Sequence, residues 1–339
     1  MAQTEKPLAA IVGGETLLGK ELRDVLAGRP LPVRLKLVGA ERDMEAVVSR
    51  EDGEPVVISA MDEENLLGAR AVFLAGTRGS SRKAFELLAA HEPAPVIVDL
   101  SRGLEDHAGA RLRSPLVETA GAPPPAAIHV IAHPAASVLA LFLGRLAARF
   151  RILRAVAQVF EPVSERGQRG IDELQQQTVS LLSFRKLPSE VFDVQAGFNL
   201  LPRYGGGAAE KLEDIEAGIE RHLATLLMSG PAPMPSLRLA HAPVFHGYSM
   251  SVWAQFDGRP GSRPLAEALA CAQIDVRTED QEAPSNVGVA GQSGFTVGAI
   301  ESDRNDPQAA WFWIAADNLR VVAEDAAAVA RQLLAGEAG

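Results

Sequence analysis

The chain has 339 residues, 47% of them hydrophobic and 5% aromatic, with a formal net charge of −10. This length favours two domains with aliphatic cores, and the acidic balance argues against nucleic acid or an anionic membrane surface as a partner. The single cysteine, Cys271, excludes an intrachain disulfide, and its apolar helical pattern predicts a packing role. No apolar run is long enough for a membrane span or a signal peptide, so we expect a cytoplasmic protein.

In the first part of the chain, short apolar runs alternate with helical patterns. The runs that predict buried strands lie at 8–12, 33–40, 71–76, 95–101 and 128–134. Leucines at helical spacing follow the first run, and residues 80–92 predict a further helix. Strands that alternate with helices indicate a parallel, doubly wound sheet of the Rossmann type, with right-handed crossovers.

The second part of the chain has longer strand patterns without tight helical interleaving, at 153–164, 237–256 and 309–320. They predict an α+β domain on a mixed or antiparallel sheet. Residues 209–227 and 324–336 predict helices. We expect a Rossmann-type domain over 1–132 plus 316–339, and a second domain over 133–315.

Glycines mark the turn between the first predicted strand and the first helix. Gly13, Gly14 and Gly19 lie where the phosphates of a dinucleotide bind the amino terminus of a helix. Thr16 takes the place of the middle glycine of a G-x-x-G-x-x-G turn. Its Cβ would clash with a pyrophosphate, or its hydroxyl would donate to it. A plain tight turn from strand to helix is the alternative interpretation.

Eight segments in chain order carry a family resemblance: IVGGETLLGKEL, VFLAGTRGSSRK, VIVDLS, IAHPAAS, GIDELQQQT, GFNLLPR, APVFHGYS and ADNLR. With them, the chain resembles the aspartate-semialdehyde dehydrogenase family over nearly its full length. The resemblance implies a dinucleotide-binding domain completed by the C-terminal helix, a middle domain for catalysis and dimerisation, and a homodimer. The implied reaction is the NADPH-dependent reductive dephosphorylation of an acyl phosphate through a cysteine thioester.

The nucleophile of that reaction is missing. The family segment that resembles N-P-N-C-S-T reads His133-Pro134-Ala135-Ala136-Ser137-Val138 here, which puts Ala136 at the cysteine. A methyl group cannot form a thioester. For the neighbouring Ser137 we expect a helix N-cap role rather than a nucleophilic one.

The other catalytic roles that the resemblance implies are also replaced. Tyr248 stands at the family's general base, and a tyrosine is a poor base at neutral pH. His241 stands at a substrate-binding arginine, Glu161 at a substrate-binding glutamine, and Glu105 at an arginine for the acyl phosphate. Because the nucleophile, the general base and the substrate-binding residues are all replaced, we expect no turnover by the family mechanism.

The residues that the resemblance assigns to cofactor binding are less altered. By resemblance, Arg42 would recognise the 2′-phosphate of NADP and Asn318, in the intact DNLR segment, would reach the nicotinamide. Asp43 adds negative charge beside that phosphate, and Val322 would narrow the nicotinamide pocket. We therefore expect NADP binding to be weak or lost. The positions that would contact it are Gly13, Thr16, Gly19, Arg42 and Asn318.

The replacing residues suggest two alternatives to simple loss. His133, Glu161, His241 and Tyr248 occupy positions that converge on one cleft in the family fold. Two histidines and a carboxylate are ligands for a divalent metal such as zinc, but a satisfied polar network that fills a vacated site is the favoured interpretation. Four other histidines are expected on the surface or in loops, namely His91, His107, His129 and His222, whereas His246 lies close in sequence to the replaced positions.

Two classes of function follow. One is a non-catalytic, homodimeric paralogue lacking the catalytic cysteine, which retains dimerisation or binds an unidentified protein partner or small molecule. The other is an enzyme of changed chemistry that uses NADP or a metal in the cleft around His133, Glu161, His241 and Tyr248. The strands within AQVFEPVS and AWFWIAA are candidates for the shared interface of a dimer.

Overall fold

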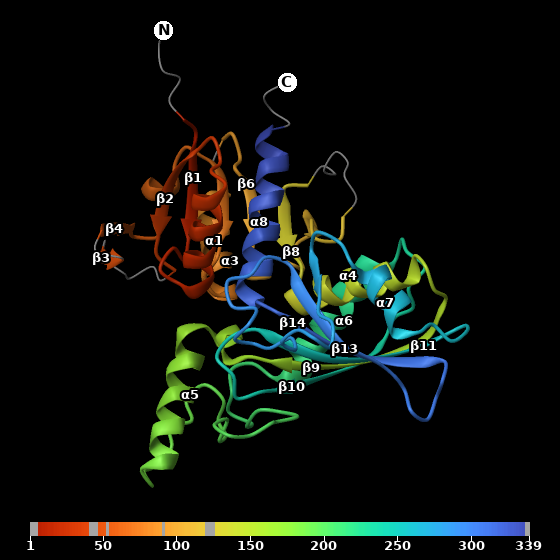
Figure 1. The fold of residues 1–339 in the computed structure, drawn as a ribbon. Helices are drawn as coiled ribbons and strands as arrows, with labels where there is room; N and C mark the ends of the chain where they lie inside the picture. Colours follow the sequence, from red (N-terminus) through yellow and green to blue (C-terminus); the bar gives the residue numbers. More distant parts are fainter. Residues whose placement is uncertain (1–5, 41–46, 52–53, 90–91, 119–125, 336–339) are drawn as a thin grey trace. The chain divides into compact units, whose positions relative to one another are not determined.

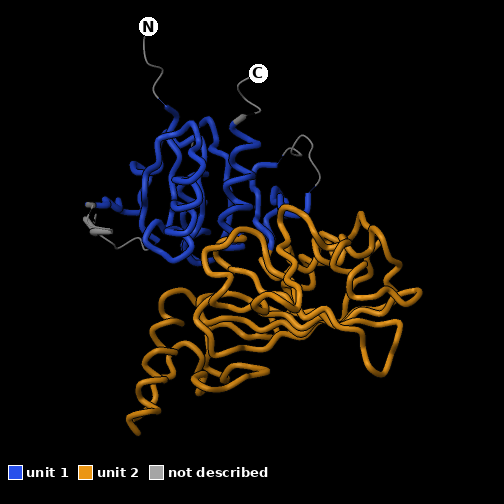
Figure 2. The backbone as a smooth tube through the Cα atoms, in the orientation of Figure 1, with its two compact units in different colours: residues 1–132, 322–339 blue, residues 133–321 orange. Residues whose placement is uncertain are grey.

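The computed structural model describes residues 6–40, 47–51, 54–89, 92–118 and 126–335. The chain forms two compact units, one of residues 1–132 and 322–339 and one of residues 133–321 (Figure 2). Arg42, Asp43 and His91 lie outside the described residues. None of the helices in the described part of the chain has the length and apolarity that a membrane crossing requires.

The first unit contains an eight-stranded sheet in the order β3-β4-β2-β1-β5-β6-β8-β7. Its strands are β1 (Leu8–Val12), β2 (Arg34–Val38), β3 (Val47–Glu51), β4 (Glu54–Ser59), β5 (Ala69–Leu74), β6 (Val96–Asp99), β7 (Ala110–Arg113) and β8 (Ile128–Ile131). All neighbours pair in parallel except β3 with β4. The predicted doubly wound sheet is therefore confirmed.

Helices cover both faces of this sheet (Figure 1). Because successive side chains of a strand point to opposite faces, Ala9 and Ile11 of β1 pack with α1 (Leu17–Gly28) and α8 (Asn318–Ala335). Ala10 and Val12 pack on the other side, with α2 (Glu63–Leu66) and α3 (Arg78–Leu88). Val322 of α8 belongs to the first of these two cores, so its side chain packs among apolar neighbours.

The second unit contains a six-stranded mixed sheet in the order β10-β9-β11-β14-β13-β12, as the α+β prediction requires. Its strands are β9 (Ile152–Glu161), β10 (Ser236–His241), β11 (Tyr248–Phe256), β12 (Ile274–Val276), β13 (Phe295–Ser302) and β14 (Ala309–Ala316). Its helices are α4 (Pro134–Ala147), α5 (Gly167–Leu182), α6 (Leu212–Leu227) and α7 (Ser262–Leu269), with a 3₁₀ turn, η1 (Val163–Arg166). The helical position expected for Cys271 is wrong, because α7 ends at Leu269; the half-buried residue forms an isolated β-bridge with Ile274, and its packing role stays a prediction.

The two faces of this sheet differ. α4, α6 and α7 contact its strands, and Ala157 and Val159 of β9 are fully buried. The alternate residues carry large apolar side chains that are half-buried or exposed: Val156, Phe160, Trp253, Trp311 and Trp313. Val156 is 45% exposed and Trp311 is 44% exposed. We call these five residues the open face; it holds all three tryptophans of the chain.

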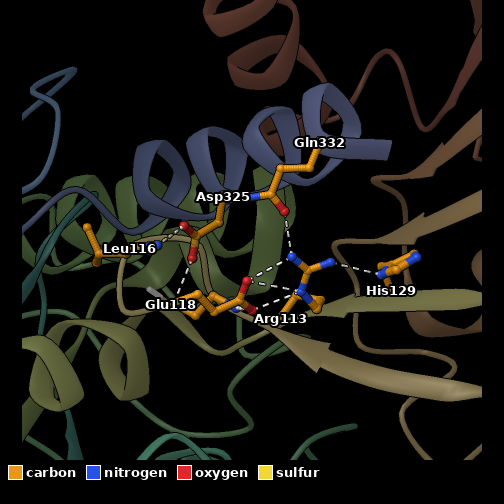
Figure 3. A network of polar contacts seen from close by, with 7 residues as sticks. Arg113, Leu116, Glu118, His129, Asp325 and Gln332 are labelled. Carbon is orange, nitrogen blue, oxygen red and sulfur yellow. Dashed lines mark hydrogen bonds and ion pairs between the residues drawn. The ribbon is translucent and has the colours of Figure 1, made fainter. Parts of the chain in front are cut away.

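A buried polar network joins α8 to β7 and β8 in the first unit (Figure 3). Arg113 is fully buried and donates to Glu118, at 2.7 to 3.1 Å, and to Gln332 Oε1 at 2.7 Å. Its remaining nitrogen lies 3.1 Å from His129 Nδ1. His129 was expected at the surface, which is wrong: it is buried, and burial together with Arg113 lowers its pKa to about 4.

Asp325 of α8 is the second centre of this network. Its Oδ1 accepts from the Leu116 amide at 2.8 Å, and its Oδ2 lies 2.9 Å from Ser114 Oγ. Burial raises the pKa of Asp325 to about 7 in spite of these hydrogen bonds. Because the folded-state pKa lies above the unfolded value, the stability that Asp325 contributes is largest at acidic pH and falls as the pH rises through about 7.

Asp325→Asn should flatten the pH dependence of stability. The amide keeps an acceptor for Leu116 and a donor for Ser114 but does not ionise, so the variant should gain stability relative to the parent as the pH rises from about 4 to about 7. Urea unfolding midpoints across this range measure the effect, with the exposed Glu64→Gln as the control. Parallel curves for the parent and Asp325→Asn would contradict the assignment.

Candidate functional site

The first turn of α4 holds the positions that the resemblance assigns to the nucleophile. Helix α4 begins at Pro134, and His133 is its N-cap, with Nδ1 accepting from the Ala135 amide at 3.3 Å. Proline is preorganised for the first helical position. The N-cap role expected for Ser137 is therefore wrong, because Ser137 lies inside the helix and donates its amide to the His133 carbonyl at 3.0 Å. Ala136 is fully buried and offers only a methyl group.

His133 lies among other buried rings. Its amide donates to Nδ1 of His222 on α6 at 2.9 Å, so His222 is a buried packing partner and not the surface residue that was expected. His133 Nε2 lies 3.4 Å from the hydroxyl of Tyr248, with the two rings edge-to-face at 5.7 Å. Since Nδ1 accepts a hydrogen bond, a neutral His133 carries its proton on Nε2, facing Tyr248. Both side chains are thus engaged with protein groups.

An ion pair lies at the carboxyl end of β9. Glu161 is fully buried and faces His241 in the register of β9 and β10. Arg166 of η1 donates from one terminal nitrogen to Glu161 and pairs through the other with Glu210. Burial alone would lower the pKa of Arg166, but Glu161 raises it above its usual value, so Arg166 stays charged. A buried carboxylate is tolerated only with such a partner.

His241 completes the polar cluster. Its Nδ1 lies 3.2 Å from the Tyr204 hydroxyl, and its ring packs against Phe192 at a centroid distance of 5.0 Å. Burial, and then Arg166, lower the pKa of His241 to about 4. Burial, and then Glu161, raise the pKa of Tyr204. At neutral pH the cluster therefore contains a neutral histidine, a protonated tyrosine and an arginine paired with two carboxylates.

Protein groups already engage two of the three side chains, His133 and Glu161, that the metal-binding alternative names. Arg166 already neutralises Glu161, and Tyr248 and the Ala135 amide engage His133. Within the described ranges, no group of three His, Cys, Asp or Glu side chains is arranged to hold a metal.

Asn318 starts α8 at the end of the second unit. Its Oδ1 accepts from the Gly247 amide at 3.0 Å and from Ser164 Oγ at 3.2 Å, and its Nδ2 donates to Glu165 at 2.8 Å. The side chain is 1% exposed. The amide for which the resemblance implies a nicotinamide contact is thus committed to neighbours within the second unit.

The glycine turn of the first unit is closely packed. Gly13 has φ +84°, and a Cβ there would lie 2.6 Å from the Gly76 nitrogen; one on Gly19 would lie 2.0 Å from the Gly13 carbonyl oxygen. Thr16 is the N-cap of α1: its hydroxyl accepts from the Gly19 amide and lies within 2.9 Å of the Gly13 and Ala75 carbonyls. The hydroxyl is therefore committed to holding the turn.

Sequence reasoning missed several polar residues that organise the second unit. Arg166 pairs with Glu161 and Tyr204 with His241, but both stand in segments that carry no recognisable motif. Glu173 and Gln177, inside GIDELQQQT, bind backbone groups of residues 188–197. Buried polar side chains at one helix face are the signal that identifies such a loop anchor. At the predicted phosphate position, Glu105 lies 3.8 Å from Arg78.

The family is decided by a comparison with family models. The model described as semialdehyde dehydrogenase, dimerisation domain, matches residues 143–321. The chain belongs to the semialdehyde dehydrogenase family. The semialdehyde dehydrogenase match covers the open face, α5, α6 and the Glu161–Arg166 pair.

Several relatives of this semialdehyde dehydrogenase family member match most of the chain. An aspartate-semialdehyde dehydrogenase of Rickettsia bellii is 27% identical over 94% of both chains. A USG-1 protein homolog of Azotobacter vinelandii is 29% identical over 92% of both. The structure of a probable aspartate-semialdehyde dehydrogenase from Pseudomonas aeruginosa superposes with a TM-score of 0.82 at 26% identity, over 97% of this chain and 99% of that one.

Removing the Arg166 guanidinium from the buried pair should lower the free energy of unfolding. Arg166→Met leaves Glu161 buried without its partner, and we expect a loss of about 3 to 5 kcal/mol in the free energy of unfolding. The double variant with Glu161→Gln should recover most of that loss. Urea unfolding measures both, with the exposed Arg169→Met as the matched control. A loss from Arg166→Met no larger than that of the control would contradict the importance of the pair.

Proposed function

We propose that the chain is a non-catalytic, homodimeric member of the semialdehyde dehydrogenase family. The observation that carries this proposal is the first turn of α4, where fully buried Ala136 presents a methyl group at the family's nucleophile position. Covalent acyl transfer requires a thiolate or an equivalent activated nucleophile at that point.

The rest of the site supports the same conclusion. A general base must accept a proton near neutral pH. Tyr248 is fully buried beside His133, and the nearby His241 has a pKa of about 4 and is blocked on Nδ1 by Tyr204. Arg166 is the positive charge of the cluster, and Glu161 and Glu210 neutralise it. A substrate carboxylate or phosphate would have to compete with these two carboxylates.

NADP, which the resemblance implies as the family cofactor, fits this chain poorly. The Thr16 hydroxyl and the Asn318 amide are both committed to the protein. The Gly13 and Gly14 amides both donate to the Val38 carbonyl, at 2.7 and 3.2 Å. We therefore propose that NADP binding is weak or lost.

The open face supports the homodimer. Val156, Trp311 and their neighbours form an apolar surface on the family's dimerisation domain, and the Phe160 and Trp313 rings stack at 6.0 Å. Large exposed apolar patches mark protein interfaces. A second copy of the chain, offering the same face, would bury it through an isologous contact.

The absence of catalysis is tested by the phosphate-dependent oxidation of aspartate semialdehyde with NADP, and separately with NAD. The purified chain should give no nicotinamide reduction above a reaction without protein, because position 136 cannot form a thioester. A cysteine-bearing relative serves as the positive control. Turnover at a rate similar to that relative would overturn the proposal, and metal-dependent or slow turnover would favour the enzyme of changed chemistry.

The homodimer is tested by Val156→Asp, which puts a charge on the open face. The parent should sediment with twice the chain mass of 35.9 kDa, and the variant should dissociate at micromolar concentration. Val57→Asp, at a 58% exposed valine of the first unit, should leave the mass unchanged. A parent that sediments as a monomer, or a Val156→Asp dimer as stable as the parent, would contradict this use of the face.

A further inference from the structure

An acidic residue stands inside the glycine turn of the first unit. Glu15 lies between Gly14 and Thr16, and its Oε1 accepts from the Ala40 amide at 2.7 Å. β2 ends at Val38, so Ala40 follows the carboxyl end of that strand directly. The side chain thus spans from the end of β1 to the end of β2.

The end of the second strand is where doubly wound domains distinguish the two nicotinamide dinucleotides. A carboxylate there accepts hydrogen bonds from the ribose hydroxyls of NAD, whereas an arginine accommodates the 2′-phosphate of NADP. Glu15 delivers a carboxylate to this place from the turn after the first strand, instead of from the second strand itself.

The second oxygen of this carboxylate is the observation that points to a ligand. Oε2 of Glu15 is buried, and no described residue gives it a hydrogen bond. A buried acceptor without a donor is unfavourable. A ribose hydroxyl would supply that donor, while a 2′-phosphate would bring a second negative charge against it.

The turn holds Glu15 in this position. Thr16, the next residue, is tied to the Gly13 and Gly19 backbone through its hydroxyl, and the Gly14 amide before it donates to Val38. The backbone on both sides of Glu15 is therefore held in place, and the Ala40 amide positions its carboxylate.

We propose that the turn of the first unit selects nucleotides with a free ribose diol, NAD(H) and its ADP-ribose portion, over their 2′-phosphorylated counterparts, and that Glu15 is the specificity-determining residue. The proposal concerns binding and goes beyond the proposed loss of catalysis. It also gives a physical reason why NADP fits poorly, namely the repulsion between the Glu15 carboxylate and the 2′-phosphate, which does not depend on the residues near the nicotinamide ring.

Calorimetric titration of the full chain with ADP-ribose and with 2′-phospho-ADP-ribose tests the proposal without the nicotinamide end. ADP-ribose should bind roughly tenfold or more tightly than the phosphorylated probe. Glu15→Gln keeps an acceptor for the Ala40 amide but removes the charge, so it should narrow the difference, mainly by improving binding of 2′-phospho-ADP-ribose. Asp24→Asn, which removes an exposed charge from α1, should leave the ratio unchanged.

Three results would overturn the proposal: equal or tighter binding of 2′-phospho-ADP-ribose by the parent, an unchanged ratio in Glu15→Gln, or no binding of either probe at millimolar concentration. Circular dichroism and the unfolding midpoint establish that Glu15→Gln is folded. If Glu15→Gln unfolds, Glu15→Ala replaces it, because it also removes the charge and should also narrow the difference in affinity between the two probes. Failure here leaves the turnover assay unaffected, so the two proposals fail independently.

Discussion

The second unit depends on one electrostatic constraint: the fully buried carboxylate of Glu161 at the end of a central strand. Burial removes a lone carboxylate from water at a free-energy cost comparable with the folding stability of a domain. A cation must therefore be buried with it. Arg166, in the 3₁₀ turn that follows the strand, is that cation, and Glu210 satisfies its other side. The charge state of the neighbouring groups follows, because Arg166 helps to hold His241 neutral and Glu161 helps to keep Tyr204 protonated.

The same constraint separates the family fold from the family chemistry. The fold rests on parts that are intact: the close packing at Gly13 and Gly19, and the loop anchors Glu173 and Gln177. None of these needs a substrate. By contrast, the polar groups near the first turn of α4 bind one another, as buried polar groups in a protein core must. A site that binds an anionic substrate needs polar groups that are free to contact that substrate. Maintenance of the fold is therefore compatible with the proposed loss of the reaction.

The fold was predictable because its signals are local. Period-two and helical apolar patterns, with glycines at the first turn, indicate a doubly wound sheet, and the sheet order confirms it. The lack of a nucleophile at position 136 could also be predicted from the sequence, because a thioester requires a sulfur atom there and alanine has none. The pairings were not: Arg166, Tyr204 and Glu15 acquire their significance from partners that only the folded chain brings within hydrogen-bond distance. His129, His222, Ser137 and Cys271 were misplaced for the same reason, since burial and helix boundaries at single residues depend on tertiary packing.

We propose that internal pairing, and not the missing sulfur alone, closes the site to the family reaction. Ala136→Cys tests it directly, because it returns the thiol and leaves the Glu161–Arg166 pair in place. Incubation with aspartate semialdehyde, phosphate and NADP, followed by intact-mass analysis and a turnover assay, should show no acyl-enzyme and no nicotinamide reduction. An acyl adduct together with turnover close to that of a cysteine-bearing relative would contradict this proposal.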